Sequence, residues 1–312
     1  MISPATIDQL ERAACATERS LLRGSVASIL LTGPAVSRRL YAGDPETRPY
    51  GDLDLLVDPA QLEAAETVLA NEGFQVAAHA APAGLTPKVR TWTRDSDGVI
   101  VELHRVLPGA DAPSDAQWRH LFGESEPLAL PTGEVRVLQP IPFLVLVALR
   151  AAEKGQGAKQ LEDLRRALAR FDVATWEAAS HFARRLDAER SFAMGMRLDR
   201  DGRQRAAQFG LSSRVSTEVA IQATSDARYR DGALALVSLK SHSGPRARLV
   251  FAAGKIAPPS AWMREFYPLA RRGRVGLALA YQLRAISLLV RLGPVLDTWR
   301  RARKVARGTT ST

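Results

Sequence analysis

Apolar and polar residues alternate over Gly51–Val57, where the chain reads Gly-Asp-Leu-Asp-Leu-Leu-Val. A period of two is typical of a β-strand, whose residues i and i+2 share a face about 6.5–7 Å apart. The pattern predicts a strand with Asp52 and Asp54 on one face and Leu53 and Leu55 on the other. Neighbouring like charges on a half-buried strand are costly, and a divalent cation is the usual remedy. The same pattern also occurs in turns and on solvated strand faces, so the segments around it must decide between a metal site and these alternatives.

Other segments with a period of two predict the rest of a sheet. An apolar run over residues 27–31 predicts the first strand. Residues 89–94 and 99–105 flank an Asp-Gly turn and predict a hairpin, and residues 128–138 predict another. Helices are expected before and between these strands, over residues 3–22, 34–41 and 58–71. Because strands and helices segregate along the chain, the predicted fold class is α+β.

The chain after Pro142 is mostly helical by its pattern. Helical spacing of apolar residues predicts helices over residues 143–154, 159–171, 176–186 and 188–198. Loops or boundary segments are expected over residues 212–225 and 238–245.

A last helix is expected over residues 275–290, interrupted by Arg284 and ended by Gly293-Pro294. A membrane-spanning helix needs about 20 apolar residues without such interruptions, so no transmembrane segment is predicted. Residues 300–307 form a basic tail, and a disordered Gly-Thr-Ser end follows. We predict two domains, a small mixed-sheet domain over residues 1–140 and a mostly helical domain over residues 141–312.

Composition narrows the function without deciding it. The net charge of +10 and a pI near 10.3 favour anionic partners, whether nucleotide, nucleic acid or a membrane surface, although basic proteins often bind none of these. The single cysteine, Cys15, excludes an internal disulfide and a Cys-rich zinc site. The first residues are polar and show no signal peptide, so the expected location is the cytoplasm.

A third acid lies in the predicted strand at residues 99–105. Glu102 and His104 alternate with apolar residues and share a face. Carboxylate oxygens suit Mg²⁺ or Mn²⁺, particularly when phosphates complete the coordination shell. From the residues alone, Glu102 is either a metal ligand or a solvated edge residue. His104 is either the neighbour of a ligand, a base, or a polar residue at a strand end.

Three pieces in this order resemble a known superfamily. They are Leu31-Thr32-Gly33-Pro34-Ala35, then Arg48 with Asp52-Leu53-Asp54-Leu55-Leu56-Val57, then Glu102-Leu103-His104. This order resembles the polymerase-beta-like nucleotidyltransferases, and within them the bacterial nucleotidyltransferase family proteins. The chain departs from that pattern at Thr32, where the family often has Lys, and at Pro34, where the superfamily has Ser or Gly.

The resemblance implies a nucleotidyltransferase domain followed by a helical domain that closes over the nucleotide. Such an enzyme moves a nucleoside monophosphate from an NTP such as ATP to a hydroxyl or phosphate acceptor and releases pyrophosphate. It implies Asp52, Asp54 and Glu102 as catalytic ligands of Mg²⁺ or Mn²⁺, two ions of which can clamp the attacking and leaving oxygens.

The resemblance also implies a nucleotide-binding set from both halves of the chain. Gly33 allows close approach of a triphosphate to a helix N-terminus. The other members of the set are Thr32, Ser37, Arg48 and Lys159. Thr32 and Ser37 can equally serve as helix caps, Arg48 can pair with an aspartate, and Lys159 can form a surface pair with Asp163 at i, i+4.

The acceptor stays open among sugars, peptides, antibiotics, lipids and tRNA. Two alternatives remain beside the enzyme. One is an inactive nucleotidyltransferase fold whose basic surface and C-terminal tail hold RNA, a peptide or an anionic surface. The other is a toxin-like nucleotidyltransferase that acts on tRNA or a protein.

Overall fold

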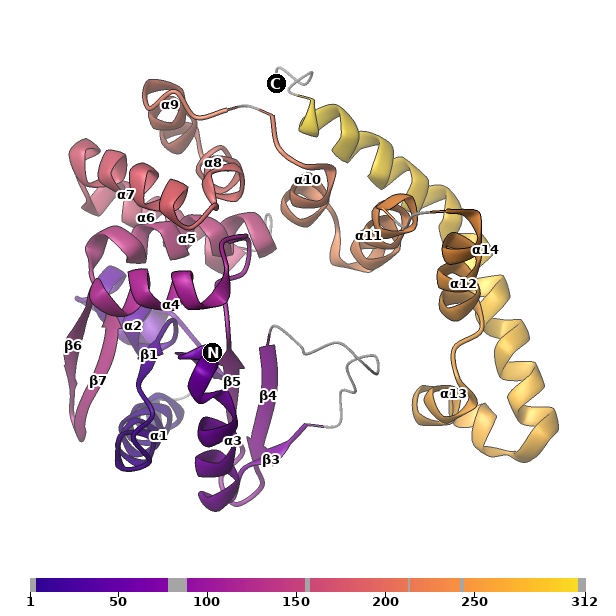
Figure 1. The fold of residues 1–312 in the computed structure, drawn as a ribbon, viewed down its shortest axis with the longest axis horizontal. Helices are drawn as coiled ribbons and strands as arrows, with labels where there is room; N and C mark the ends of the chain where they lie inside the picture. The colour runs from indigo at the N-terminus through magenta and orange to yellow at the C-terminus, as the bar shows by residue number, and fades with distance from the viewer. Residues whose placement is uncertain (1–3, 78–88, 155–157, 213, 242–243, 308–312) are drawn as a thin grey trace. The chain divides into compact units, whose positions relative to one another are not determined.

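The computed structural model describes the whole chain except residues 1–3, 78–88, 155–157, 213, 242–243 and 308–312 (Figure 1). These described residues form two compact units, 1–211 and 212–312. The first unit holds a mixed seven-stranded sheet with its helices, and the second is helical. The α+β class predicted from the sequence is confirmed.

The sheet has the strand order β3-β4-β5-β2-β1-β7-β6. Its strands are β1 (Ser28–Leu30), β2 (Leu53–Val57), β3 (Gln75–Val76), β4 (Val89–Arg94), β5 (Val99–His104), β6 (Ser125–Leu130) and β7 (Gly133–Leu138). β4–β5 and β6–β7 are antiparallel hairpins, as the sequence predicts. β2 runs antiparallel to β1 and parallel to β5, so the strand that carries Asp54 is central.

Helices cover both faces of the sheet in the first unit (Figure 1). They are α1 (Pro4–Arg23), α2 (Pro34–Leu40), α3 (Leu62–Asn71), α4 (Ser114–Gly123), α5 (Pro140–Lys154), α6 (Ala158–Arg170), α7 (Val173–Arg185), α8 (Glu189–Met196) and α9 (Arg200–Gln208), with short 3₁₀ turns η1 (Pro45–Thr47) and η2 (Pro59–Gln61). The sequence pattern does not predict β3, α4 or α9. The first two flank long connections, and α9 is too polar to show an apolar period.

Two apolar cores lie on opposite faces of β2. Leu53, Leu55 and Val57 pack with residues of α1 and α3. Leu56 packs in the other core, which α2 and α5 close. Asp54 has the parity of Leu56, so its side chain lies on the α2 and α5 side. The alternation of residues along β2 thus places Asp54 on the side of the sheet that α2 and α5 cover.

The last strand, β7, ends at Leu138, and α5 begins at Pro140. Residues 140–211 nevertheless belong to the same compact unit as the sheet, because α5 packs on β7 and α6 packs on α2. A domain boundary at residues 140 and 141 stays a prediction.

The second unit consists of α10 (Thr217–Thr224), α11 (Ala227–Ser241), α12 (Pro245–Ile256), α13 (Ser260–Phe266), the 3₁₀ turn η3 (Pro268–Arg271) and α14 (Gly273–Ala306). The first segment expected as a loop or boundary, residues 212–225, begins at the boundary between the two units but also holds α10, and the second, residues 238–245, holds the end of α11. Ser216 caps α10 by accepting a hydrogen bond from the Val219 amide, so a serine that suggested a loop instead starts a helix.

α14 continues through Gly293-Pro294, where the sequence predicts an end. Pro inside a helix costs about 3 kcal/mol, and packing of α14 on α10 and α11 compensates for that cost. The basic tail is the last part of this helix up to Ala306, and the predicted disordered end lies outside the described residues. In the part of the chain that the structure describes, α14 is the one helix long and apolar enough to span a membrane, with a mean hydropathy of 1.4 over 18 residues. α14 is longer than the helix expected over residues 275–290, and the absence of a transmembrane segment stays a prediction.

Candidate active site

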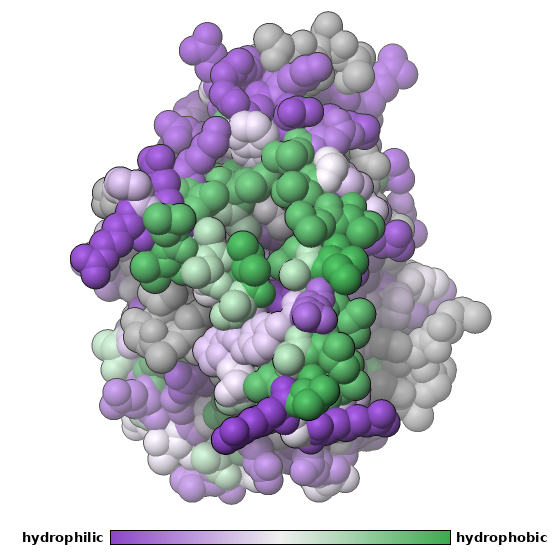
Figure 2. Space-filling model, turned by 90° about the vertical axis from the view of Figure 1, so that its right-hand side faces the viewer, coloured by the Kyte–Doolittle hydropathy of each residue, from purple (hydrophilic) through white to green (hydrophobic). Residues whose placement is uncertain are grey.

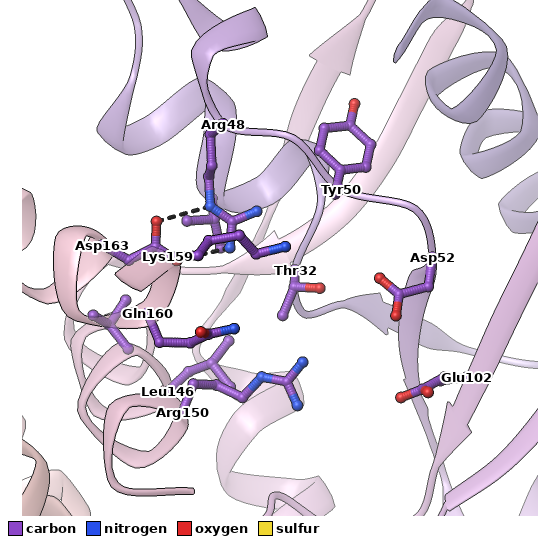
Figure 3. A pocket seen from close by; sticks show the side chains of 12 residues that line it. Thr32, Arg48, Tyr50, Asp52, Glu102, Leu146, Arg150, Lys159, Gln160 and Asp163 are labelled. Carbon is purple, nitrogen blue, oxygen red and sulfur yellow. Dashed lines mark hydrogen bonds and ion pairs between the residues drawn. The ribbon is translucent and has the colours of Figure 1, made fainter. Parts of the chain in front are cut away.

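The acids meet where β2 and β5 run side by side. The register pairs Asp54 with Glu102 and Leu56 with His104. The ligand atoms of Asp54, Glu102 and His104 all lie within 4.8 Å of one another. Asp52 precedes the first residue of β2 and lies in the pocket opening above Glu102 (Figure 3). A parallel strand pair thus gathers two carboxylates 48 residues apart in the chain.

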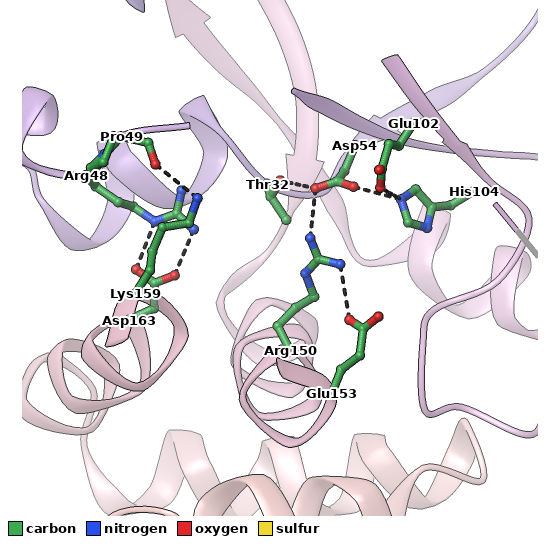
Figure 4. Close-up of polar contacts among 10 residues, drawn as sticks. All are labelled: Thr32, Arg48, Pro49, Asp54, Glu102, His104, Arg150, Glu153, Lys159 and Asp163. Carbon is green, nitrogen blue, oxygen red and sulfur yellow. Dashed lines mark hydrogen bonds and ion pairs between the residues drawn. The ribbon is translucent and has the colours of Figure 1, made fainter. Parts of the chain in front are cut away.

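Asp54 is buried and held by three donors from three elements (Figure 4). The Thr32 hydroxyl donates to Oδ2, and His104 Nε2 lies 2.8 Å from Oδ1. Arg150 Nη2, from α5, donates to Oδ2 at 3.1 Å. Burial alone would raise the pKa of Asp54, but the His104 hydrogen bond and the Arg150 charge hold it well below its ordinary value. Asp54 is therefore ionised, and His104 Nε2 must carry the hydrogen of their bond.

The pKa of Glu102 is shifted in the opposite direction. Burial and the charge of Asp54 raise the pKa of Glu102, with Asp52 adding to the repulsion. Its side chain is 31% exposed and so reaches the pocket, and its Oε2 lies 3.7 Å from His104 Nε2. The site therefore has an excess of negative charge at the mouth of the pocket, where a cation would relieve it.

A cationic wall lies opposite the acids (Figure 3). It is made by Arg48, which follows η1, by Arg150 of α5 and by Lys159 of α6. Burial and the charge of Arg48 lower the pKa of Lys159, whose Nζ donates to the Pro49 carbonyl at 3.0 Å. The pocket is thus acidic on the strand side and basic on the helix side. This arrangement suits a phosphate group with a divalent cation, because the cation binds carboxylates and the phosphate oxygens bind basic side chains.

Arg48 and Asp163 form a buried two-point ion pair. Arg48 Nε and Nη2 donate to the two Asp163 oxygens at 2.8 and 2.7 Å, and the Tyr41 hydroxyl donates to Oδ1 at 2.9 Å. The Lys159–Asp163 surface pair expected from their spacing is therefore wrong, because α6 turns Asp163 inward toward the loop before β2. Arg48 Nη1 is buried, and within the described residues no hydrogen-bond partner reaches it.

Gly33 and Tyr50 shape the floor of the pocket. Gly33 has φ 63°, a conformation that side chains other than glycine rarely adopt. A Cβ there would lie 3.3 Å from the Tyr50 ring. Gly33 therefore allows the β1–α2 turn to pass close to the segment that carries Asp52.

The structure brings most of the predicted residues together. Thr32, Arg48, Asp52, Glu102 and Lys159 line one pocket, Asp54 and His104 lie directly beneath it, and Gly33 adjoins it. Ser37 is not brought in: it is buried in α2, and its hydroxyl donates to the Pro34 carbonyl at 3.3 Å.

Sequence reasoning missed the contribution of α5 and part of α6. Arg150 reaches Asp54, and Gln160 lines the same pocket. Arg150 had a visible signal, since it is the one charged residue within the apolar run of residues 143–152. Gln160 had no such signal, because polar residues are common on helix surfaces.

A protein-family comparison decides the relationship. The model of a family described as uncharacterised nucleotidyltransferase matches residues 14–201. The chain belongs to this family. The match includes every residue of the pocket, from Thr32 to Asp163, and ends before the second unit.

Solved structures show weaker likeness. The antibiotic-resistance factor ANT(2'')-Ia is 13% identical with a TM-score of 0.40, over 58% of this chain and 93% of that one. An antigenic nucleotidyltransferase-like protein from Paracoccidioides brasiliensis is 16% identical with a TM-score of 0.33, over 60% of this chain and 94% of that one. No curated protein matches the chain.

Proposed function

We propose that the protein transfers a nucleoside monophosphate from an NTP to a hydroxyl or phosphate acceptor and releases pyrophosphate, with Mg²⁺ or Mn²⁺ as cofactor. One observation carries the proposal. Asp52 and Glu102 open into a pocket above the buried Asp54, and Arg48, Arg150 and Lys159 face them from the other side. Family membership supports this arrangement as a nucleotidyl-transfer site.

The residues fit a divalent cation. Asp52 and Glu102 present hard oxygen ligands to the pocket, and Asp54 adds a third carboxylate. Burial and the charge of Asp54 raise the pKa of Glu102, so a cation beside Glu102 would stabilise its charged form. Bound divalent cations would neutralise the triphosphate and activate the acceptor oxygen. Arg150, 3.1 Å from Asp54, would exchange this carboxylate for phosphate oxygens.

The chain's own residues then have distinct tasks. Arg150 and Lys159 bind phosphate oxygens from the helix side, and His104 fixes the orientation of Asp54. A bond forms between the acceptor oxygen and the α-phosphorus, while the bond from the α-phosphorus to the bridging oxygen breaks and pyrophosphate leaves. Glu102, half-buried and more basic than an ordinary carboxylate, accepts the proton of an acceptor hydroxyl.

The test is transfer from each α-labelled NTP into a cell extract with Mg²⁺ or Mn²⁺, followed by identification of the labelled product. Asp52→Asn and Glu102→Gln should abolish labelling. Glu134→Gln, an exposed acid on β7, is the matched control and should label normally. The proposal is wrong if wild-type protein labels nothing and NTP with metal causes no thermal shift. Binding without transfer would instead favour an inactive binding module.

A further inference from the structure

The positive charge of the protein is concentrated in the second unit. Residues 212–312 contain 18 Lys and Arg and 5 Asp and Glu, a net charge of +13. Residues 1–211 contain 25 and 28, a net charge of −3. The unit with the candidate active site is thus slightly acidic. The strongly basic composition of the chain needs an explanation in the second unit, outside the family match.

The second unit also exposes large apolar side chains along α14. Val275 and Val290 are each 74% exposed, and Leu289 is 70% exposed. With Leu279, Leu283 and Ile286, they fall within roughly a third of the helix circumference at 3.6 residues per turn. Beside this stripe the small residues Gly276 and Ala280 are buried, while Leu288 and Leu292, 39% and 45% exposed, lie on the other side of the helix. α14 therefore packs on its unit with small residues and turns its large apolar residues outward.

The neighbouring helix extends this apolar exposure. α12 packs on α14 and exposes Leu249, Val250 and Ile256. Figure 2 shows hydrophobic residues over a broad part of one face of the molecule, with hydrophilic residues around them. Apolar exposure of this extent marks an interaction surface in soluble proteins.

Basic residues stand at both ends of the exposed α14 stripe. Arg272 and Arg274 precede it, and Arg300 and Arg301 follow it, all on exposed positions. Exposed apolar residues on a helix that has Arg near both ends are typical of helices that lie in a membrane interface. Arg284, within the helix, donates to the Lys255 carbonyl at 2.8 Å, so that side of α14 contacts its own unit.

We propose that the second unit binds the surface of an anionic lipid bilayer, with the exposed apolar stripe of α14 in the interface and the surrounding arginines on lipid headgroups. Charge argues against a second copy of the chain, because two +13 surfaces repel each other. The first unit offers no matching apolar face. Its large apolar side chains exposed in the described residues, Leu22, Val76, Phe122 and Val173, lie on four different elements.

The experiment is co-sedimentation of the full-length protein with vesicles of phosphatidylcholine alone or with one third phosphatidylglycerol. We expect strong binding to the anionic vesicles, weakening with salt. Replacing Leu283, Leu289 and Val290 by Gln should weaken binding about tenfold or more. The matched control replaces Leu22, Val76 and Val173 of the first unit by Gln and should bind as wild type. Circular dichroism and melting temperature verify that both triple variants fold.

Four results would overturn the proposal. The α14 variant could bind as tightly as wild type, so that charge alone is responsible. Binding could be equal on neutral and anionic vesicles. The wild-type protein could be a monomer and bind neither kind of vesicle, which would mean that its own first unit covers the stripe. Sedimentation equilibrium could show a dimer that the α14 variant dissociates, so that a second copy is the occupant.

Discussion

The buried ion pair between Arg48 and Asp163 fastens the loop before β2 to α6. The side chains are only 5% and 7% exposed, and their two hydrogen bonds of 2.8 and 2.7 Å leave no room for water between them. Asp163→Asn keeps the size of the side chain and removes its charge. The guanidinium of Arg48 would then stay buried without a counter-charge, and the Tyr41 hydroxyl would lose a charged acceptor.

The expected loss follows from the cost of an uncompensated buried charge. Breaking one partner of a buried pair costs about 3–5 kcal/mol, whereas an exposed pair contributes about 0–1 kcal/mol. In a unit of 211 residues, each kcal/mol shifts the melting temperature by about 2–4 °C, so a shift of about 6–20 °C is expected. Replacing both partners, as Arg48→Met with Asp163→Leu, should recover most of this loss, because no charge is left buried.

The assay is urea denaturation with scanning calorimetry, and hydrogen exchange of α6 assigns the transition to the first unit. Glu162→Gln is the matched control on the same helix. Its partner is Arg166 at 2.8 Å, and both side chains are more than 40% exposed. That variant should change stability by less than about 1 kcal/mol. The reasoning is refuted if Asp163→Asn costs no more than this control, or if the double variant is less stable than the single one.

Three further predictions concern other parts of the first unit. One of them uses a control variant in the second unit. Burial raises the pKa of Glu18 above its ordinary value of 4.5, so the folded state binds that proton more tightly and stability falls as the pH rises through the folded pKa. Glu18→Gln should raise the melting temperature more at pH 8 than at pH 4, and an equal shift at both would contradict this. A Cβ on Gly195 would lie 1.9 Å from the Ala148 carbonyl, so Gly195→Ala should cost about 1–3 kcal/mol in urea denaturation, while Gly254→Ala, with open space around it, should cost nothing. Arg150→Met should tighten Mn²⁺ binding and weaken NTP binding in calorimetry, and a loss of Mn²⁺ binding would count against the proposed site.

Much of the sheet could be predicted because its signals are local. The alternation at residues 52–57 sets the parity of β2 whatever its neighbours are, and both hairpins show turn residues at their tips. The pairing of Asp54 with Glu102 could not be predicted from those signals alone. It depends on β2 and β5 being parallel neighbours, which is decided by contacts between segments far apart in the chain. The resemblance to the family pattern predicted that these two acids belong to one site, but it did not predict the strand pairing that brings them together.

The helical side of the site was harder to predict for a physical reason. A Lys and an Asp four residues apart have the same spacing in the sequence whether their side chains pair on a helix surface or point to different partners. Only the packing of α6 against α2 shows that Asp163 faces Arg48, 115 residues earlier, while Lys159 turns to the pocket. The continuation of α14 through Pro294 was hidden for the same reason, since packing outweighs the local penalty.

The two layers of acid in the pocket have different consequences for any test of function. Asp54 accepts from Thr32, His104 and Arg150, so it joins the β1–α2 turn, β5 and α5 as well as facing the site. A neutral residue there would leave Arg150 and His104 without their acceptor charge and lower stability along with any activity. Glu102 opens into the pocket and is repelled by its neighbours. Its neutralisation relieves the fold, so lost activity with unchanged or higher stability at Glu102 is the cleaner evidence for chemistry at this site.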